Sequence, residues 1–73
     1  MTTEQKIALL EETLEVDEGT LKLEMELAEI DEYDSMSKLG IIVMMEDEFG
    51  VKLTGDNFKQ FKTVGDIVNM MNN

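Results

Sequence analysis

The sequence predicts an all-α fold, a small four-helix bundle with a long loop between helices one and two and a short third helix. Apolar residues recur at helical spacing in several segments, and glycine, threonine and aspartate stand between those segments. The chain has no proline that would break a helix. With 73 residues, 42% of them hydrophobic, it is long enough for one small domain spanning residues 1–73.

The first helix is expected from about Thr3 to Glu15. Thr2 and Gln5 have the spacing of a capping box, in which each residue bonds to the backbone of the other. Apolar residues then recur at helical spacing: Ile7, Leu10 and Leu14. The segment 16–20 should end this helix, because Gly19 tolerates the left-handed conformation used in turns.

The segment 21–27 alternates apolar and charged residues, which is the period of a half-buried strand. No other segment alternates in this way, and a strand without a partner leaves its backbone groups unpaired. We therefore predict an extended or partly helical loop that packs three apolar side chains onto the helices: Leu21, Leu27 and Ile30.

The second helix is expected to begin after Asp34 and to run to about Phe49. The Asp34 side chain can accept from the amide of Met36 or Ser37, and Gly50 is a good C-cap. Beyond a stripe of apolar residues at helical spacing, three more widen the apolar surface: Leu39, Val43 and Met44. The sequence thus predicts a central helix that touches several neighbours.

The last two helices should be short. The turn-rich segment 54–57 leads into a third helix containing Phe58 and Phe61, and Thr63 with Asp66 repeats the capping spacing. The fourth helix is expected over residues 64–71, where apolar residues have amphipathic spacing: Val64, Ile67, Val68 and Met71. Asn72 and Asn73 should fray.

Composition narrows the classes of function. A formal net charge of −11 and a pI near 4.1 disfavour nucleic acid and anionic membranes as partners and favour basic protein surfaces. Without cysteine there are no disulfides or thiolate metal sites, and no segment has the spacing of an EF-hand loop, so we expect no metal site. The N-terminus has no signal-peptide pattern and no window is apolar enough to span a bilayer, which predicts a cytoplasmic protein.

The tripeptide Asp34-Ser35-Met36 stands at the expected start of the second helix. The chain has no histidine and no cysteine, so Ser35 has no evident partner that would make it a nucleophile. We predict that the protein is not an enzyme and that something is attached at Ser35. The alternative is that these residues only cap the helix, in a small acidic protein that binds basic partners.

The chain resembles the acyl carrier protein family, most closely over residues 34–71. The resemblance rests on Asp34-Ser35-Met36, on the apolar helix that ends at Glu46-Asp47-Glu48-Phe49-Gly50, and on the segment 61–68. It implies that Ser35 receives phosphopantetheine from coenzyme A through a phosphopantetheinyl transferase. The thiol of that arm would carry an acyl group as a thioester for partner enzymes in fatty-acid, polyketide or related biosynthesis, or else an aminoacyl or peptidyl group. Asp34 would position the motif for the transferase.

Members of this family dock on basic patches of acyl-loading and acyl-transferring enzymes through the helix after the serine. The resemblance implies that Met36 meets such partners, and that the acidic contact is shifted toward the helix end, to Glu46, Asp47 and Glu48. Glu32 and Tyr33 replace residues that are commonly small in the family, which predicts a differently shaped approach to Ser35. We expect a monomeric, specialised carrier.

Overall fold

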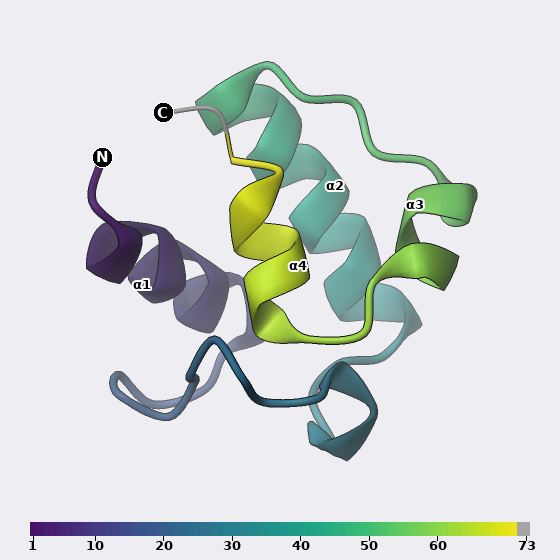
Figure 1. Ribbon diagram of the computed structural model, residues 1–73. Helices are drawn as coiled ribbons and strands as arrows, with labels where there is room; N and C mark the ends of the chain where they lie inside the picture. Colours follow the sequence, from purple (N-terminus) through teal and green to yellow (C-terminus); the bar gives the residue numbers. More distant parts are fainter. Residues whose placement is uncertain (72–73) are drawn as a thin grey trace.

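Four α-helices and one short 3-10 helix form the part of the chain that the computed structural model describes, residues 1–71. In chain order the elements are α1 (Thr3–Leu14), the 3-10 helix η1 (Leu27–Glu29), α2 (Ser35–Phe49), α3 (Gly55–Gln60) and α4 (Val64–Asn69). Figure 1 shows α1 on one side of α2 and α4, with α3 on the other side. The predicted all-α fold, with its long loop after α1 and its short third helix, is confirmed.

The core lies where α1 contacts α2 and α4. Its largest fully buried side chains come from three helices and from η1: Leu10, Leu27, Ile41, Met45, Val64 and Ile67. Because apolar groups from α1, η1, α2 and α4 meet here, removal of this surface from water is the main force that holds the bundle together. The two ends of the described chain also meet, since the Lys6 ammonium donates to the Met71 carbonyl at 3.1 Å.

Three helix boundaries differ from the predictions. The first helix ends one residue early because Glu15 adopts the left-handed conformation at the C-cap, with φ of 60°. Gly19 is left-handed as predicted, with φ of 86°, in the turn that follows. Phe61 lies outside α3 because its backbone is extended. The last helix stops at Asn69, where the amides of Met70 and Met71 bond to carbonyls only three residues back. The predicted fraying of Asn72 and Asn73 lies outside the described residues.

The loop between α1 and α2 buries Leu21, Leu27 and Ile30, as predicted. The buried Glu11 carboxylate anchors its first half by accepting from the Leu21 amide at 2.9 Å. The second half runs antiparallel to the segment that leads into α4, with three backbone bonds and one isolated bridge between Glu26 and Thr63. The alternating segment therefore has a backbone partner. That partner is the short segment before α4, whose own sequence does not alternate.

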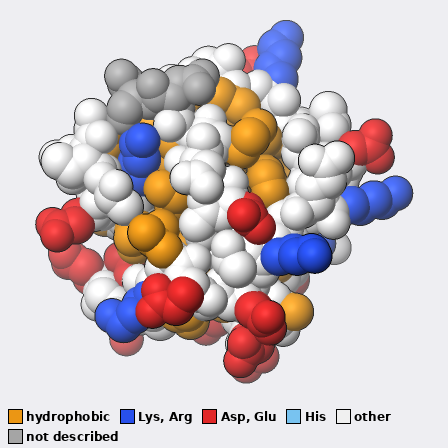
Figure 2. Space-filling view, viewed as in Figure 1, with side chains coloured by type: hydrophobic (Ala, Val, Ile, Leu, Met, Phe, Trp, Pro, Cys, Tyr) orange, Lys and Arg blue, Asp and Glu red, His pale blue; other side chains and the backbone are white. Residues whose placement is uncertain are grey.

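The apolar surface of α2 is not all buried. Met44 lies in the core, but Leu39 is 64% exposed and Val43 is 59% exposed. The prediction that Leu39 and Val43 help α2 to contact its neighbours is therefore wrong. These two side chains point away from the face that packs on α1. Figure 2 shows acidic side chains gathered over α1 and the long loop. Within residues 1–71, no helix has both the length and the apolar composition that a bilayer crossing requires.

Candidate functional site

A reciprocal capping box holds the start of α2. The Asp34 carboxylate accepts from the Ser37 amide and the Ser37 hydroxyl accepts from the Asp34 amide, both at 2.9 Å. The prediction that Asp34 caps this helix through one of the next amides is confirmed, with Ser37 as the partner. The return bond from Ser37 was missed, although serine three residues after an aspartate resembles the capping-box spacing.

Ser35 is the first residue of α2 and its side chain is exposed. Within residues 1–71 its backbone amide has no hydrogen-bond acceptor. Free amides and the positive end of the helix dipole favour an anion at such a position. The hydroxyl is therefore accessible, and a phosphate ester formed on it would be favourably placed.

The Asp34 carboxylate is hydrogen-bonded in the helix cap and not to the Ser35 hydroxyl. Its bond from the Ser37 amide holds the pKa of this carboxyl below its ordinary value, so the group is ionised at neutral pH. Among the described residues no hydrogen bond joins it to the Ser35 hydroxyl. The arrangement thus lacks the base contact that activates a serine nucleophile.

A pocket of about 400 Å³ lies between α2 and α3 and includes Ser35 in its wall. Ile42 and Phe58 give it apolar surface, and Lys38 and Lys59 give it two ammonium groups in a chain of net charge −11. This combination fits a phosphopantetheine arm, because the cations complement a phosphodiester and the apolar side chains can cover the tether. Lys59 was not singled out from the sequence, since it comes close to Ser35 only when α3 packs beside α2, whereas Lys38 follows Ser35 by three residues on the same helix.

Tyr33 and Lys38 pair across the start of α2. The Lys38 ammonium lies 5.0 Å from the centre of the Tyr33 ring, a cation–π contact. These residues occupy the positions of a hydrophobic staple, just before the cap and on the second turn, which could have been noticed from their spacing. The Tyr33 ring packs against the core, and burial raises the pKa of its hydroxyl.

Met36 is 81% exposed and forms one stripe with the exposed Leu39 and Val43, which follow at intervals of three and four residues. We call these three residues the apolar stripe. The acidic residues expected to meet partners are all exposed at the far end of the same helix: Glu46, Asp47 and Glu48. Helical spacing places Asp47 and Glu46 in line with the apolar stripe and turns Glu48 away from it.

The described residues contain no group of three or more acidic side chains close enough together to hold a metal ion. The site is thus made of one exposed hydroxyl, nearby lysines and an apolar stripe.

A family model described as the phosphopantetheine attachment site matches residues 7–71. The chain belongs to the acyl carrier protein family. An acyl carrier protein of Thermosynechococcus vestitus is 32% identical over 66 residues, which cover 90% of this chain and 82% of the relative. One from Phytoplasma mali is 34% identical over 65 residues, which cover 88% of this chain and 77% of the relative.

A solved structure agrees. The solution structure of a holo acyl carrier protein from Geobacter metallireducens matches with a TM-score of 0.74 and 25% identity, over 97% of this chain and 83% of that one. As an acyl carrier protein the chain is a carrier and not an enzyme, and its prosthetic group is covalently attached phosphopantetheine. The family predicted from the sequence is confirmed.

Proposed function

We propose that Ser35 is the attachment point of phosphopantetheine and that the chain carries acyl groups as thioesters in fatty-acid, polyketide or related biosynthesis. The observation that supports this most directly is the exposed Ser35 hydroxyl, at a helix start whose first amide has no acceptor in the described part of the chain and with two lysines lining the same pocket. When bound, the group supplies the thiol that this cysteine-free chain lacks.

The role of the chain is to present this hydroxyl. The Ser35 oxygen forms a bond to the phosphorus that bears the pantetheine arm, and the bond from that phosphorus to the adenosine bisphosphate part of coenzyme A breaks. The serine proton leaves with that product. Because Asp34 is held in the cap and no base among residues 1–71 is hydrogen-bonded to the Ser35 hydroxyl, a separate phosphopantetheinyl transferase would supply the base.

Partner enzymes would dock on the apolar stripe and on the acidic residues aligned with it. Desolvation of Met36, Leu39 and Val43 would supply affinity. Exposed ion pairs from Asp47 and Glu46 to a basic patch contribute only about 0.2–1 kcal/mol each, so they would set encounter rate and partner choice. We propose that the protein acts in the cytoplasm as a monomer.

The test is the intact mass of the protein after incubation with coenzyme A and a broad-specificity phosphopantetheinyl transferase. We expect one phosphopantetheine per chain in the wild type and none in Ser35→Ala. Since Ser35 is exposed, this variant should unfold within about 0.5 kcal/mol of the wild type.

Ser37→Ala is the matched control, because it removes a neighbouring hydroxyl that takes part only in the cap. It should still be modified. Modification that persists in Ser35→Ala, or a wild type left unmodified by two different transferases, would contradict the proposal.

A further inference from the structure

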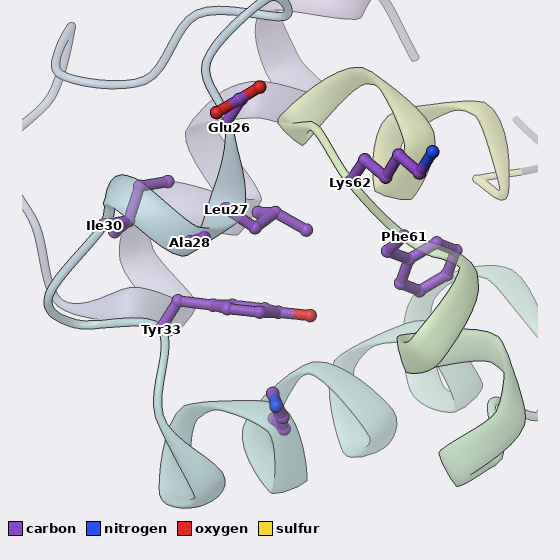
Figure 3. A pocket seen from close by; sticks show the side chains of 8 residues that line it. Glu26, Leu27, Ala28, Ile30, Tyr33, Phe61 and Lys62 are labelled. Atoms are coloured by element: carbon purple, nitrogen blue, oxygen red, sulfur yellow. The ribbon is translucent and has the colours of Figure 1, made fainter.

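A second pocket lies on the other side of Lys38, between η1, the first turns of α2 and the segment after α3 (Figure 3). Its volume of about 530 Å³ lies within the range of small-molecule sites. We call it the tyrosine pocket, and its lining residues include Leu27, Ile30, Tyr33, Lys38, Phe61 and Lys62.

The Tyr33 hydroxyl is buried and has no hydrogen-bond partner within the described residues. Figure 3 shows the ring lying across the pocket, with its oxygen pointing toward the side of Phe61. A buried polar group without a partner is unfavourable, and such groups in native proteins usually mark a missing ligand or water. The hydroxyl is therefore a donor that lacks an acceptor, and because almost none of its surface is exposed, the ring would have to shift slightly for it to reach a group in the pocket.

The charged groups around the pocket also favour an acceptor. The Lys38 ammonium lies over the Tyr33 ring, and Lys62 is part of the lining. Glu26 is the one carboxylate among the lining residues, and Figure 3 shows it at the end of the pocket away from Tyr33. Around the phenol end, no acceptor within residues 1–71 satisfies the Tyr33 hydroxyl, and the Lys38 ammonium lies over the same ring, which suits an oxygen-bearing ligand better than a bare hydrocarbon.

The tyrosine pocket adjoins the pocket that contains Ser35. Lys38 lines both of them, and Phe58 of one contacts Phe61 of the other edge to face at 5.5 Å between ring centres. Lys38 follows Ser35 by three residues, a rise of about 4.5 Å along the helix. A group tethered at Ser35 can therefore pass over Lys38 into the tyrosine pocket.

We propose that the tyrosine pocket receives the acyl group of the loaded carrier and favours short acyl groups that end in a carboxylate over hydrocarbon groups of the same length. This inference rests on the proposed function, because it requires an acyl group attached through Ser35. Tyr33 and Lys38 are the residues that set the preference, and Leu27 and Ile30 cover the methylene groups of the cargo.

The test compares glutaryl and pentanoyl groups, which have equal chain length and differ in the terminal carboxylate. Each is loaded from its coenzyme A thioester by the transferase, loading is verified by intact mass, and the melting temperature is measured. A tenfold bias of the glutaryl group for the pocket corresponds to about 1.4 kcal/mol, or roughly 6–11 °C in a domain of this size. We expect a difference of this order in favour of the glutaryl form.

Tyr33→Phe is the decisive variant, because it removes only the unpartnered hydroxyl and should fold at least as well as the wild type. In Tyr33→Phe the glutaryl advantage should be largely lost, leaving only the part that Lys38 contributes. Lys38→Gln should reduce it, while Lys52→Gln, an exposed lysine outside both pockets, should leave it unchanged. Tyr33 is the single tyrosine of the chain, so its ring NMR signals should shift on glutaryl loading and not on pentanoyl loading.

The outcomes separate the two proposals. A chain that takes up no phosphopantetheine contradicts the proposed function. A chain that is loaded, but whose glutaryl and pentanoyl forms melt alike, or whose glutaryl advantage is as large in Tyr33→Phe as in the wild type, contradicts the pocket proposal alone.

Discussion

The starts of α2 and α4 use the same local device with opposite results. Each has a reciprocal capping box, formed by Asp34 with Ser37 in α2 and by Thr63 with Asp66 in α4. In both, the aspartate carboxylate accepts backbone amides, and its pKa lies below the ordinary value for that reason. By local sequence and capping geometry alone, either helix start could hold an anion.

The difference is whether another segment covers the first turn. At α4 the amides of Val64 and Gly65 donate to carbonyls of the long loop at 3.0 and 2.9 Å, and Val64 is fully buried. At α2 the Ser35 amide has no acceptor among residues 1–71, and Ser35 and Met36 face solvent. A capped helix start thus becomes a candidate site only where the tertiary fold leaves it uncovered.

The largest predicted contrast is between a buried side chain near the start of α4 and an exposed one near the start of α2. Ile67 is fully buried, so Ile67→Ala should lower the free energy of unfolding by about 2–5 kcal/mol through lost burial and a cavity. Met36 is 81% exposed, so Met36→Ala should change it by no more than about 0.5 kcal/mol. Urea denaturation of the unloaded protein measures both.

A loss of more than about 1 kcal/mol in Met36→Ala would mean that the apolar stripe packs within the domain and does not await a partner. In that case the contrast between the two helix starts would fail. The loss in Ile67→Ala is large relative to the few kcal/mol expected for a domain of this size, so this variant is measured together with the wild type in a stabilising osmolyte.

The second contrast concerns glycines. A Cβ at Gly65 would lie 3.2 Å from the backbone oxygen of Leu23, the acceptor of its own amide, so Gly65→Ala should weaken the loop contact and lower stability by about 1 kcal/mol. A Cβ at Gly40 would lie 3.2 Å from a methyl group of Thr13, which is a side chain. Because a side chain can move aside, the higher helix propensity of alanine should outweigh this contact. Gly40→Ala should therefore be neutral or stabilising by up to about 1 kcal/mol.

Equal destabilisation by both alanines in urea denaturation would show that the loop carbonyl at Leu23 gives way as easily as a side chain. The covering of α4 by the loop would then be loose, and the contrast with α2 would be smaller than the static structure indicates.

The sequence predicted the features that depend on neighbours in the chain. The capping boxes of α1 and α4, the Asp34 cap and the left-handed Gly50 follow from residue types a few positions apart. It could not predict that the segment 23–27 pairs with the start of α4, because this pairing joins residues about 40 positions apart through backbone groups, which carry no residue signature. Exposure of Leu39 and Val43 was missed because apolar character alone does not distinguish a core face from a partner face.

The same division applies to the site. Ser35 and Asp34 could be found from a local motif, whereas Lys59 and the tyrosine pocket depend on the packing of α3 and η1 beside α2. Tyr33 was noticed for its size, but its buried hydroxyl is a property of the fold.

The smallest predicted contrast is in the pH dependence of the two boxes. The Asp66 carboxylate accepts from the amides of Lys62 and Thr63 at 2.8 and 3.1 Å, whereas Asp34 accepts from the Ser37 amide at 2.9 Å. Each folded pKa is lowered, so the stabilisation is complete above the ordinary aspartate pKa of about 3.9 and is lost as pH falls through the folded value.

Asp66→Asn and Asp34→Asn remove the charge and keep a carbonyl acceptor. At pH 7 the free energy of unfolding should be lower than in the wild type for both, and more so for Asp66→Asn because two amides lose a charged partner. At pH 3 both deficits should shrink. Deficits are compared, not absolute stabilities, because acid also relieves the repulsion of a chain with net charge −11. If the Asp66 deficit is unchanged between the two pH values, its carboxylate is not held by these amides, and the two helix starts differ less in electrostatics than in coverage.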